Sequence, residues 1–468
     1  MTARLRFLGA AQNITGSRHL LDTDNVRLLV DCGLHQERQF KGRDWDTFPA
    51  PPSSIDAVLL THAHLDHCGF VPRLASQGFQ GPVYCTPATA DIARIMLLDA
   101  AHIQEEDAAY KAKRHRKENR RGPYPEVPLY TVEEAEASLA LFHSVPYGEE
   151  VELADGVTAS FHDAGHVLGS AMIRVTMREN SDRRTVLFSG DVGRWNKPML
   201  KDPTLFEQAD YVVVEATYGD RLHEDQDTIA STLAQAIRET LDAGGNILVP
   251  SFALERAQEV LYYLNVLMSE GRIPPLLVFL DSPMAVSITE VFKHHPELFD
   301  SEMNELMAQG HSPFDFPGLH MVRTVEQSKT INNVTGTAMI IAGSGMCTGG
   351  RIKHHLVRNI SRAESTVLFV GYQADGTLGR HIVDGADEVR VLGTMRPSRA
   401  RVVQVQGFSA HADRDELLRW LSGLHSAPRR LFVVHTEPEA GSHFARLAGE
   451  KAGCEAHMPA YLDEVVLT

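Results

Sequence analysis

Cysteine is scarce in this sequence, and the few cysteines show no pattern. Five of the 468 residues are cysteine, scattered along the chain without a C-x-x-C pair or a regular spacing. An odd number of isolated cysteines does not build a disulfide framework, and it gives no thiolate metal site of recognisable spacing. We therefore expect reduced thiols and a cytoplasmic protein.

Long apolar runs and a signal sequence are also missing. No stretch of about 18 uncharged apolar residues occurs, so the sequence predicts no transmembrane helix and no membrane partner. The first residues, Met1 to Gly9, enter strand-like sequence directly and lack the layout of a signal peptide. The composition is ordinary for a globular protein, and the length suggests about two to four domains.

Positive charge is in the minority. The chain has 45 Lys and Arg against 61 Asp and Glu, a formal net charge of -16 at pH 7. Long-range attraction to phosphate is then poor, which argues against a general nucleic-acid coat protein. A nuclease stays compatible, because bound metal ions supply local positive charge. One dense basic run, Lys111 to Arg121, is either a solvated helix end or a contact for a polyanionic substrate.

Histidine, in contrast, is abundant and clustered. Three of the 23 histidines lie with an aspartate in Thr61 to Gly69, T-H-A-H-L-D-H-C-G, directly after an apolar run that predicts a buried strand. Imidazole nitrogens and carboxylate oxygens are ligands that suit Zn²⁺. His62 and His64 can converge on one ion, whereas Asp66 and His67 would point to a neighbouring position. Some clustering arises by chance, but this pattern behind a strand favours a metal site.

Other potential ligands close short β-type runs elsewhere in the chain. The residues in such positions are Asp31, His166, Asp191, Glu215 and His435. Taken singly, each is best explained as a polar residue that ends a strand or begins a turn. Their recurrence indicates one edge of a sheet sandwich that is lined with polar groups.

The character of the chain changes after Gly219. Strand-like and helical segments alternate from there to about residue 395, which predicts a parallel sheet covered on both faces. The glycine-rich loop Gly343 to Gly350 lies between a strand and a helix, where backbone N–H groups could hold a phosphate. It matches neither a P-loop nor a dinucleotide fingerprint, so a purely structural turn is the alternative.

Together these motifs resemble the metallo-β-lactamase superfamily and its β-CASP branch of nucleases. The first likeness rests on T-H-A-H-L-D-H-C-G with Asp31, His166 and Asp191. The second rests on Glu215, on His411 within F-S-A-H-A-D, and on His435. The segments P-S-F-A-L-E-R-A-Q-E, D-S-P-M-A and S-G-M-C-T-G-G-R also resemble the β-CASP branch, so the resemblance covers nearly the whole chain.

The resemblance implies an α/β fold in which an αββα metallo-β-lactamase sandwich is interrupted by an inserted α/β β-CASP domain with a mainly parallel sheet. Residues 1–218 and 396–468 would form the sandwich, and residues 219–395 would form the inserted domain. The substrate cleft would lie between them. This organisation agrees with the alternation of strands and helices after Gly219.

The resemblance also implies two Zn²⁺ per chain. One zinc would be held by His62, His64, His166 and Asp191. The second would be held by Asp66, His67, Asp191 and His435, with Asp191 bridging. A water between two such cations loses a proton near neutral pH and is placed for in-line attack on phosphorus. Asp31 would orient ligand histidines by hydrogen bonding.

Further catalytic and substrate-binding roles follow from the same likeness. Besides Asp66, the catalytic group would contain His411, which resembles the family histidine that contacts the scissile phosphate and protonates the leaving oxygen. Glu215 resembles its acidic partner, which holds that histidine in one tautomer. The candidates for contacts to substrate phosphate are Ser344, Gly345 and Arg351.

One position departs from the family pattern. After the last strand the family usually has V-H-G-E, whereas this chain has V-H-T-E at Val434 to Glu437. Thr436 carries a Cβ where glycine is expected, so we expect altered backbone geometry beside the second metal.

The leading hypothesis is a two-zinc ribonuclease that hydrolyses RNA phosphodiester bonds and leaves 5′-phosphate and 3′-hydroxyl ends. It would act as an endonuclease on single-stranded RNA, with 5′-to-3′ exonuclease action at the same site. His435 favours RNA, because the DNA-repair members of the family carry an apolar residue there. The alternatives are a DNA nuclease, a small-ester hydrolase and an inactive scaffold subunit of an RNA-processing complex. A homodimer is compatible with the sequence.

Overall fold

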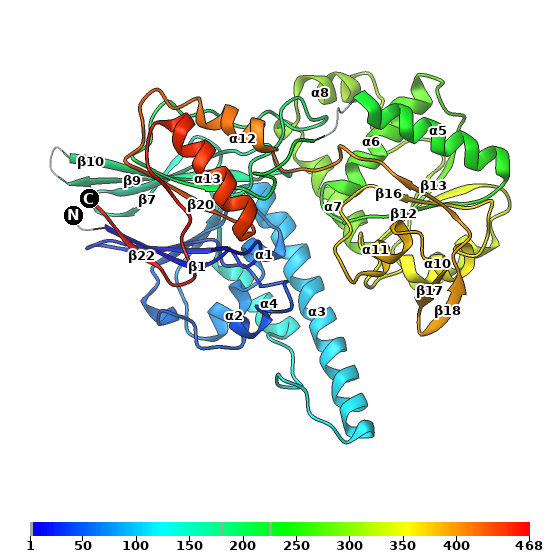
Figure 1. The fold of residues 1–468 in the computed structure, drawn as a ribbon, viewed down its shortest axis with the longest axis horizontal. Coiled ribbons are helices and arrows are strands. Elements are labelled where there is room, and N and C mark those ends of the chain that lie inside the picture. Colours follow the sequence, from blue (N-terminus) through cyan, green and yellow to red (C-terminus); the bar gives the residue numbers. More distant parts are fainter. Residues whose placement is uncertain (1–2, 180–181, 224–226) are drawn as a thin grey trace. The chain divides into compact units, whose positions relative to one another are not determined.

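Both ends of the chain build the first of two structural units, and the middle of the chain builds the second (Figure 1). The computed structural model describes residues 3–179, 182–223 and 227–468. The first unit consists of Met1–Lys197, Lys201–Leu222 and His411–Thr468, and the second of Pro198–Leu200 and His223–Ala410. Within the described ranges, no helix combines the length and apolar character needed to cross a bilayer.

The first unit contains two seven-stranded sheets. The order of strands in one sheet is β22 (Glu464–Leu467), β1 (Ala3–Gly9), β2 (Arg18–Asp22), β3 (Arg27–Val30), β4 (Ala57–Leu59), β5 (Val83–Cys85) and β6 (Phe142–Ser144). The order in the other is β21 (Ala456–His457), β20 (Arg430–Val434), β11 (Tyr211–Glu215), β10 (Asp182–Phe188), β9 (Ala171–Glu179), β8 (Val157–Asp163) and β7 (Glu150–Ala154). The strand β20 joins the sheet parallel to β11, which brings the last part of the chain beside Glu215.

The alternation of side chains along β11 explains its continuous apolar sequence. Val213 packs into the core between the two sheets with Phe7 and Phe161. Val212 and Val214 point to the opposite face, into a second core formed with the helices α12 (Arg414–Leu421) and α13 (Pro438–Ala452). A strand that is buried on both faces needs apolar residues at every position.

The other sheet carries helices on its own outer face (Figure 1). These helices are α1 (Leu65–Cys68), α2 (Val71–Ser76), α3 (Pro87–Glu118) and α4 (Val132–Ser138). The first unit is therefore an αββα sandwich, as the resemblance implied.

The second unit contains a six-stranded sheet in which every pairing is parallel. Its order is β14 (Leu319–Met321), β13 (Leu277–Asp281), β15 (Ala338–Ala342), β12 (Ile247–Pro250), β16 (Thr366–Phe369) and β19 (Arg401–Gln404). The α-helices of this unit are α5 (Asp227–Ala243), which precedes the strands, and α6 (Arg256–Ser269), α7 (Pro283–His294), α8 (Ser301–Ala308), α9 (Val325–Thr330), α10 (Ile352–Asn359) and α11 (Leu378–Val383) between them. A hairpin of β17 (Glu388–Val391) and β18 (Thr394–Pro397) completes the unit. The predicted mainly parallel sheet is confirmed.

Candidate metal centre

The histidine-rich stretch follows β4, where the chain turns from a strand into the short helix α1. His64 is the N-cap residue of α1 and has extended backbone angles, φ -65° and ψ 146°. His62 lies two residues earlier, after the end of β4, and residues two apart share a side of an extended chain. Asp66 and His67 belong to the first helical turn and point elsewhere. This change of backbone conformation separates four adjacent ligands into two pairs.

The first pair converges with two residues from distant loops. The His62 Nε2 atom lies 2.9 Å from His64 Nδ1, and His166 Nε2 lies 3.4 Å from the same atom. The Asp191 Oδ2 atom lies 3.4 Å from His62 Nε2 and 3.5 Å from His166 Nε2. In a tetrahedral zinc site, bonds of about 2.0–2.1 Å put neighbouring ligand atoms about 3.3 Å apart. These four side chains therefore have the separations that one zinc requires.

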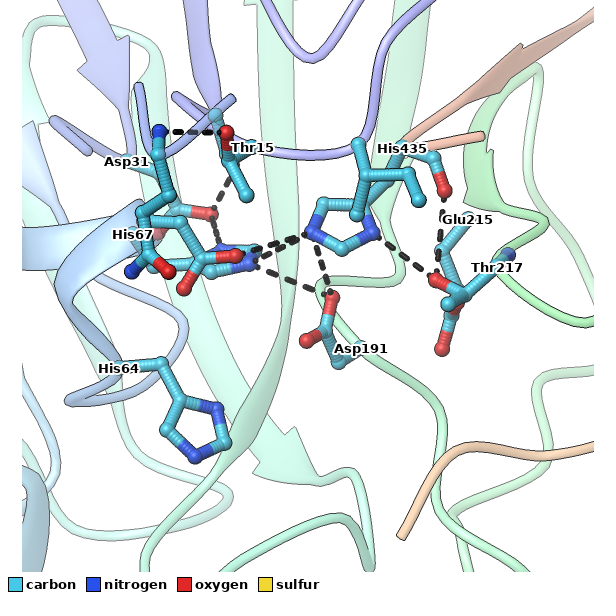
Figure 2. Close-up of polar contacts among 12 residues, drawn as sticks. Thr15, Asp31, His64, His67, Asp191, Glu215, Thr217 and His435 are labelled. Carbon is cyan, nitrogen blue, oxygen red and sulfur yellow. Dashed lines mark hydrogen bonds and ion pairs between the residues drawn. The ribbon is translucent and has the colours of Figure 1, made fainter. Parts of the chain in front are cut away.

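The second pair meets His435, which follows β20 (Figure 2). The Nε2 atoms of His67 and His435 are 3.2 Å apart, and His435 Nε2 lies 3.5 Å from Asp66 Oδ2. Asp191 Oδ1 lies 3.3 Å from His67 Nε2. The two oxygens of Asp191 thus face different ligand sets, which is the geometry of a bridging carboxylate.

The hydrogen bonds of His67 and His435 occupy both Nδ1 atoms, and the two Nε2 atoms face each other. His67 Nδ1 lies 2.7 Å from Asp31 Oδ2, to which it can only donate. Thr217 Oγ1 donates to the backbone oxygen of His435 and so accepts from His435 Nδ1 at 2.9 Å. Each ring thus uses Nδ1 as a donor, and the two Nε2 atoms lie where they could both bind one cation. Asp191 Oδ1 is also buried and accepts no hydrogen bond from any group that the structure describes.

Asp31 lies behind the histidines. Its Oδ1 atom accepts hydrogen bonds from the backbone N–H of Thr61 at 2.8 Å and from the Thr61 hydroxyl at 2.9 Å. Because that hydroxyl proton is used on Asp31, the Thr61 oxygen is free to accept from His62 Nδ1, 3.1 Å away. Asp31 and Thr61 together direct Nε2 of both His62 and His67 into the cluster.

Burial and charge prepare the cluster for cations. Burial lowers the pKa of His62 and of His166 well below the usual value, and it lowers the pKa of His64 to about 4. These rings are neutral near pH 7 and keep lone pairs for a metal. Burial also acts against a charged His67, but the Asp191 and Asp31 carboxylates outweigh it and raise its pKa. The buried carboxylates of the cluster therefore stabilise positive charge placed beside them.

His411 lies at the edge of the same cluster. Its Nδ1 atom is 2.9 Å from Glu215 Oε1, and its Nε2 atom is 3.9 Å from Asp191 Oδ2. Burial lowers the pKa of His411, but the Glu215 and Asp191 carboxylates more than compensate and raise it to about 9. The side chain of His411 is 20% exposed, whereas that of Glu215 is 1% exposed. The imidazolium thus has one nitrogen held by Glu215 and the other directed toward the ligands.

Close backbone contact holds three of these segments together. A Cβ atom on Gly193 would lie 1.9 Å from the carbonyl oxygen of Gly165, next to His166. Gly193 also forms an isolated β-bridge with His411. Only glycine allows the Asp191 loop to approach the His166 loop this closely.

Thr436 fits beside His435 without strain. The backbone of His435 has a φ of +53°, and Thr436 is not among the described residues with positive φ. Thr436 is fully buried, and its Cγ2 atom fills the space over Gly441, where a Cβ would lie 2.5 Å away. The threonine therefore occupies a position that has room for a Cβ, and His435 still reaches His67.

The residues predicted to contact substrate phosphate lie in the second unit. Arg351 Nη1 donates to Asp281 Oδ1 at 2.7 Å, and its Nη2 donates to the carbonyl oxygen of Arg323 at 2.8 Å. The hydroxyl of Ser344 accepts from the backbone N–H of Gly349 at 3.1 Å. The Arg351 guanidinium is thus held by Asp281 and by the chain after β14, and its contact with a phosphate stays a prediction.

Sequence reasoning assigned no role to the hydroxyls that orient the ligands. Thr61 stands inside the recognised histidine stretch, and Thr217 follows Glu215 by two residues. A threonine at a strand end is common, since β-branched residues favour strands. Its position directly before a histidine of the cluster, or two residues after Glu215, is the only signal that the sequence offers.

Thr217 provides a test of this orienting role. Replacement of Thr217 by valine keeps the shape but removes the acceptor for His435 Nδ1, so the ring can adopt the wrong tautomer or rotate. We expect the affinity for a zinc ion held by the His67 and His435 set to fall by about 10- to 100-fold, as for other partners of metal-bound histidines. Competition with a chelator of known affinity measures this loss. Thr217→Ser, which keeps the hydroxyl, should bind zinc as the parent does; equal affinities for all three proteins would contradict the role.

Three family models match successive parts of the chain. A metallo-beta-lactamase superfamily domain matches residues 20–208, and a Beta-Casp domain matches residues 257–382. A Zn-dependent metallo-hydrolase RNA specificity domain matches residues 396–459. The last match includes His411 and His435.

The chain also has similar relatives. It is 39% identical over 432 residues to ribonuclease TTHA0252 of Thermus thermophilus, with 92% of each chain covered. It is 32% identical over 479 residues to transcription termination factor FttA of Methanosarcina mazei, covering 99% of this chain and 71% of the relative. A crystal structure of a protein of unknown function from Enterococcus faecalis V583 aligns over the full length of both chains with a TM-score of 0.57 and 12% identity, which supports the fold alone.

Proposed function

This chain belongs to the β-CASP family of the metallo-β-lactamase superfamily, a family of metal-dependent hydrolases, and from this membership we propose that it is a zinc-dependent ribonuclease. Its substrate would be single-stranded RNA, cut internally to leave 5′-phosphate and 3′-hydroxyl ends, with 5′-to-3′ exonuclease action at the same site. The assignment of RNA is supported by the match to an RNA specificity domain and by the relative named as a ribonuclease.

The proposal rests on the position of Asp191, whose two carboxylate oxygens face two different groups of histidines. One of its oxygens lies beside His62 and His166, and the other lies beside His67. The buried carboxylate thus offers one oxygen to each of two ligand sets. Beside it stands His411, which a hydrogen bond to Glu215 holds in place. Two adjacent cation sites and a positioned imidazolium are what phosphodiester hydrolysis needs.

We assign two zinc ions to the site. His62, His64, His166 and Asp191 would hold one, and Asp66, His67, Asp191 and His435 the other. When bound, the ions lower the pKa of a water and offset the charge that develops on the phosphoryl oxygens. Asp31, Thr61 and Thr217 keep the Nε2 lone pairs of the histidines directed inward. Asp66, whose side chain is 17% exposed against 3% for Asp191, would also accept a hydrogen bond from the water.

His411 would act as the general acid that protonates the leaving group. Because its Nδ1–H is donated to Glu215, its other nitrogen carries the proton that faces the ligand cluster. That nitrogen donates to a phosphate oxygen of the substrate and then gives its proton to the departing 3′ oxygen. Glu215 accepts backbone N–H bonds from Val192 and Thr217, so its carboxylate is fixed before substrate binds.

We further propose different roles for the two domains, one in catalysis and the other in contact with the RNA backbone. Residues 1–218 and 396–468 supply the catalytic side chains, and residues 219–395 form a β-CASP domain whose loop with Ser344, Gly345 and Arg351 contacts the RNA backbone. Support comes from the loop N–H groups near a strand end and from the Arg351 guanidinium, which is 20% exposed.

Cleavage of oligonucleotides of matched sequence tests the proposed function. The protein is incubated with RNA and with DNA, both labelled at the 5′ end, in the presence of Zn²⁺ or of a chelator. We expect RNA to be cut, DNA to persist, and the chelator to abolish cleavage. The sizes of the earliest products separate internal cuts from stepwise removal of nucleotides.

The other possible results would each change the proposed function in a different way. Chelator-sensitive cleavage of DNA alone would replace the RNA assignment by a DNA nuclease. Failure to cut either polymer with two zinc ions bound would overturn the nuclease proposal. Cleavage of RNA that the chelator leaves unchanged would remove the metal centre from the reaction.

A further inference from the structure

The helix α3 joins the metal centre to a remote part of the first unit. At its start, the hydroxyls of Thr86 and Thr89 donate to the carbonyl oxygen of Gly169 at 2.6 and 2.8 Å. Gly169 belongs to the loop that carries His166. The helix then continues for 32 residues and extends beyond the sandwich (Figure 1). At 1.5 Å per residue, its far end lies about 40 Å from its contact with this loop.

The two ends of α3 have different surroundings. Its first half is packed against the sandwich and contains a series of buried residues that ends at Ala101. In the rest of the helix, only Ala108 and His115 are buried. The far end therefore gains little from apolar packing, and its sequence is not explained by the core.

Seven basic side chains gather at this far end. They are Lys111, Lys113, Arg114, Arg116, Lys117, Arg120 and Arg121, and all are exposed. Three of them take part in ion pairs, with Asp107 or Glu118 as the partner. Lys113, Arg116 and Lys117 form no ion pair with any residue that the structure describes. We call Tyr110 to Arg121 the basic tip.

The basic tip has a fixed shape. His115 is buried, and its Nδ1 atom lies 2.6 Å from Glu126 Oε1 on the returning chain. That chain is also held by the backbone N–H of Leu129, which donates to Gln104 Oε1 at 3.2 Å. The helix ends at Asn119, whose left-handed conformation closes it with a bond to the carbonyl of His115. The cations are therefore displayed on an anchored helix and not on a loose loop.

An exposed aromatic side chain lies on the same helix face as Lys113 and Lys117. Tyr110 is 65% exposed, and Lys113 and Lys117 follow it at helical spacings of three and seven residues. Cations next to an exposed aromatic ring form the usual surface for single-stranded nucleic acid, because bases stack on the ring while phosphates bind the cations. Attraction of cations to the C-terminal end of the helix dipole explains charge in the last turn, but it does not explain Tyr110 or Lys113.

We propose that the basic tip of α3 is a second RNA-binding site, which holds the backbone of single-stranded RNA while another part of the same strand occupies the metal centre. This inference rests on the proposed ribonuclease function. In a chain with a net charge of -16, such a patch offers a polyanion local attraction against the overall repulsion. It would favour long RNA over short fragments.

The distance along α3 makes the proposal testable through RNA length. A stacked strand advances about 3.4 Å per nucleotide, so about 12 nucleotides span 40 Å. An RNA of about 30 nucleotides can therefore contact both sites at once, and one of about 5 nucleotides cannot reach from one to the other. Neutralising the tip should affect the long RNA only.

The test compares two variants of the full chain that lose three charges each. One carries Lys113→Gln, Arg116→Gln and Lys117→Gln, since glutamine keeps helix propensity. The control carries Arg430→Gln, Arg446→Gln and Lys451→Gln, three exposed residues of the same unit outside the tip. Binding to labelled RNA is measured by fluorescence anisotropy in a chelator, and cleavage is measured separately with zinc.

The tip variant should bind the long RNA about tenfold or more weakly, and the slope of log affinity against log salt should fall by about 2. Its KM for long RNA should rise by a similar factor at unchanged kcat, while both values for the short RNA match those of the parent. A separate Tyr110→Ala variant should weaken long-RNA binding by about tenfold without changing the salt slope.

The proposal is overturned if the tip variant and the control bind the long RNA equally well. It is also overturned if the affinity of the tip variant for the short RNA falls as much as its affinity for the long RNA. The short RNA cannot reach both sites, so an equal loss would not come from a remote site. Failure of the parent protein to cleave RNA would refute the proposed function instead, and the binding measurement, made without turnover, distinguishes the two failures.

Discussion

Replacement of both His62 and His64 by alanine should abolish RNA cleavage. The two residues would supply half of the proposed ligands of one zinc, and His62 is fully buried against Asp191. Loss of an outer partner of a metal-bound histidine already costs about 10- to 100-fold, so removal of two ligands should cost about 10⁴-fold or more in turnover. Initial rates on a labelled RNA, at enzyme concentrations varied over several decades, measure the loss.

Two exposed histidines provide the matched control. The side chains of His102 and His457 are 66% and 48% exposed. Their joint replacement by alanine should leave the rate within about twofold, as expected for surface positions. Circular dichroism should show the same fold for all three proteins. If the variant without His62 and His64 still cleaves RNA at the parental rate, the reaction does not take place at this cluster. If the protein were an inactive scaffold, the same variant would keep the scaffold's function.

Replacement of His411 by alanine should lower kcat by about 10²- to 10⁴-fold, the usual contribution of a positioned proton donor. The bound zinc should remain at two ions per chain, because His411 belongs to neither set of proposed ligands. The loss should be much smaller with a nitrophenyl phosphodiester, since nitrophenolate leaves without a proton. An equal loss on both substrates would contradict the role of His411 as the proton donor.

Glu215→Gln tests the same role through pH. The carboxylate raises the pKa of His411, which must be protonated to act, so activity should fall as pH rises through that pKa. Glutamine removes the negative charge and keeps the side-chain shape. We therefore expect the alkaline limb of the kcat profile to shift to lower pH in the variant. An unchanged limb with a lower kcat throughout would mean that Glu215 only supports the structure.

The sequence indicated part of the candidate ligand set because its chemistry is concentrated. The histidine stretch between Thr61 and Gly69 is dense enough to indicate a metal by itself. Its partners His166 and His435 lie far away in the chain, and their individual signals were no stronger than those of ordinary strand ends. The family pattern selected them, and the structure brings their nitrogens within 3.5 Å of other ligand atoms.

The pairing of strands that lie far apart in the chain could not be predicted from the sequence. Nothing local indicates that β22, the last strand, pairs antiparallel with β1, the first. The hydroxyl of Thr217 likewise acquires its role only when β20 lies beside β11 and brings His435 within 2.9 Å. The alternation of strands and helices, by contrast, predicted the parallel sheet, because a parallel pairing requires such a crossover.

The charged run from Lys111 to Arg121 shows the same limit. Its sequence fits a solvated helix end as well as a polyanion contact. The structure adds that the helix is anchored at His115 and that Tyr110 is exposed on the face of two lysines. Those facts depend on tertiary packing, which composition does not record.

Titration of the metal-free protein with Zn²⁺ tests most directly whether two ions in this cluster carry RNA cleavage. Metal is removed with a chelator, the chelator is dialysed away, and the cleavage rate is followed as zinc is added in fractions of an equivalent. The account predicts no cleavage without zinc and a rate that stops rising at two equivalents per chain. A plateau at one equivalent, or full cleavage with none, would contradict it.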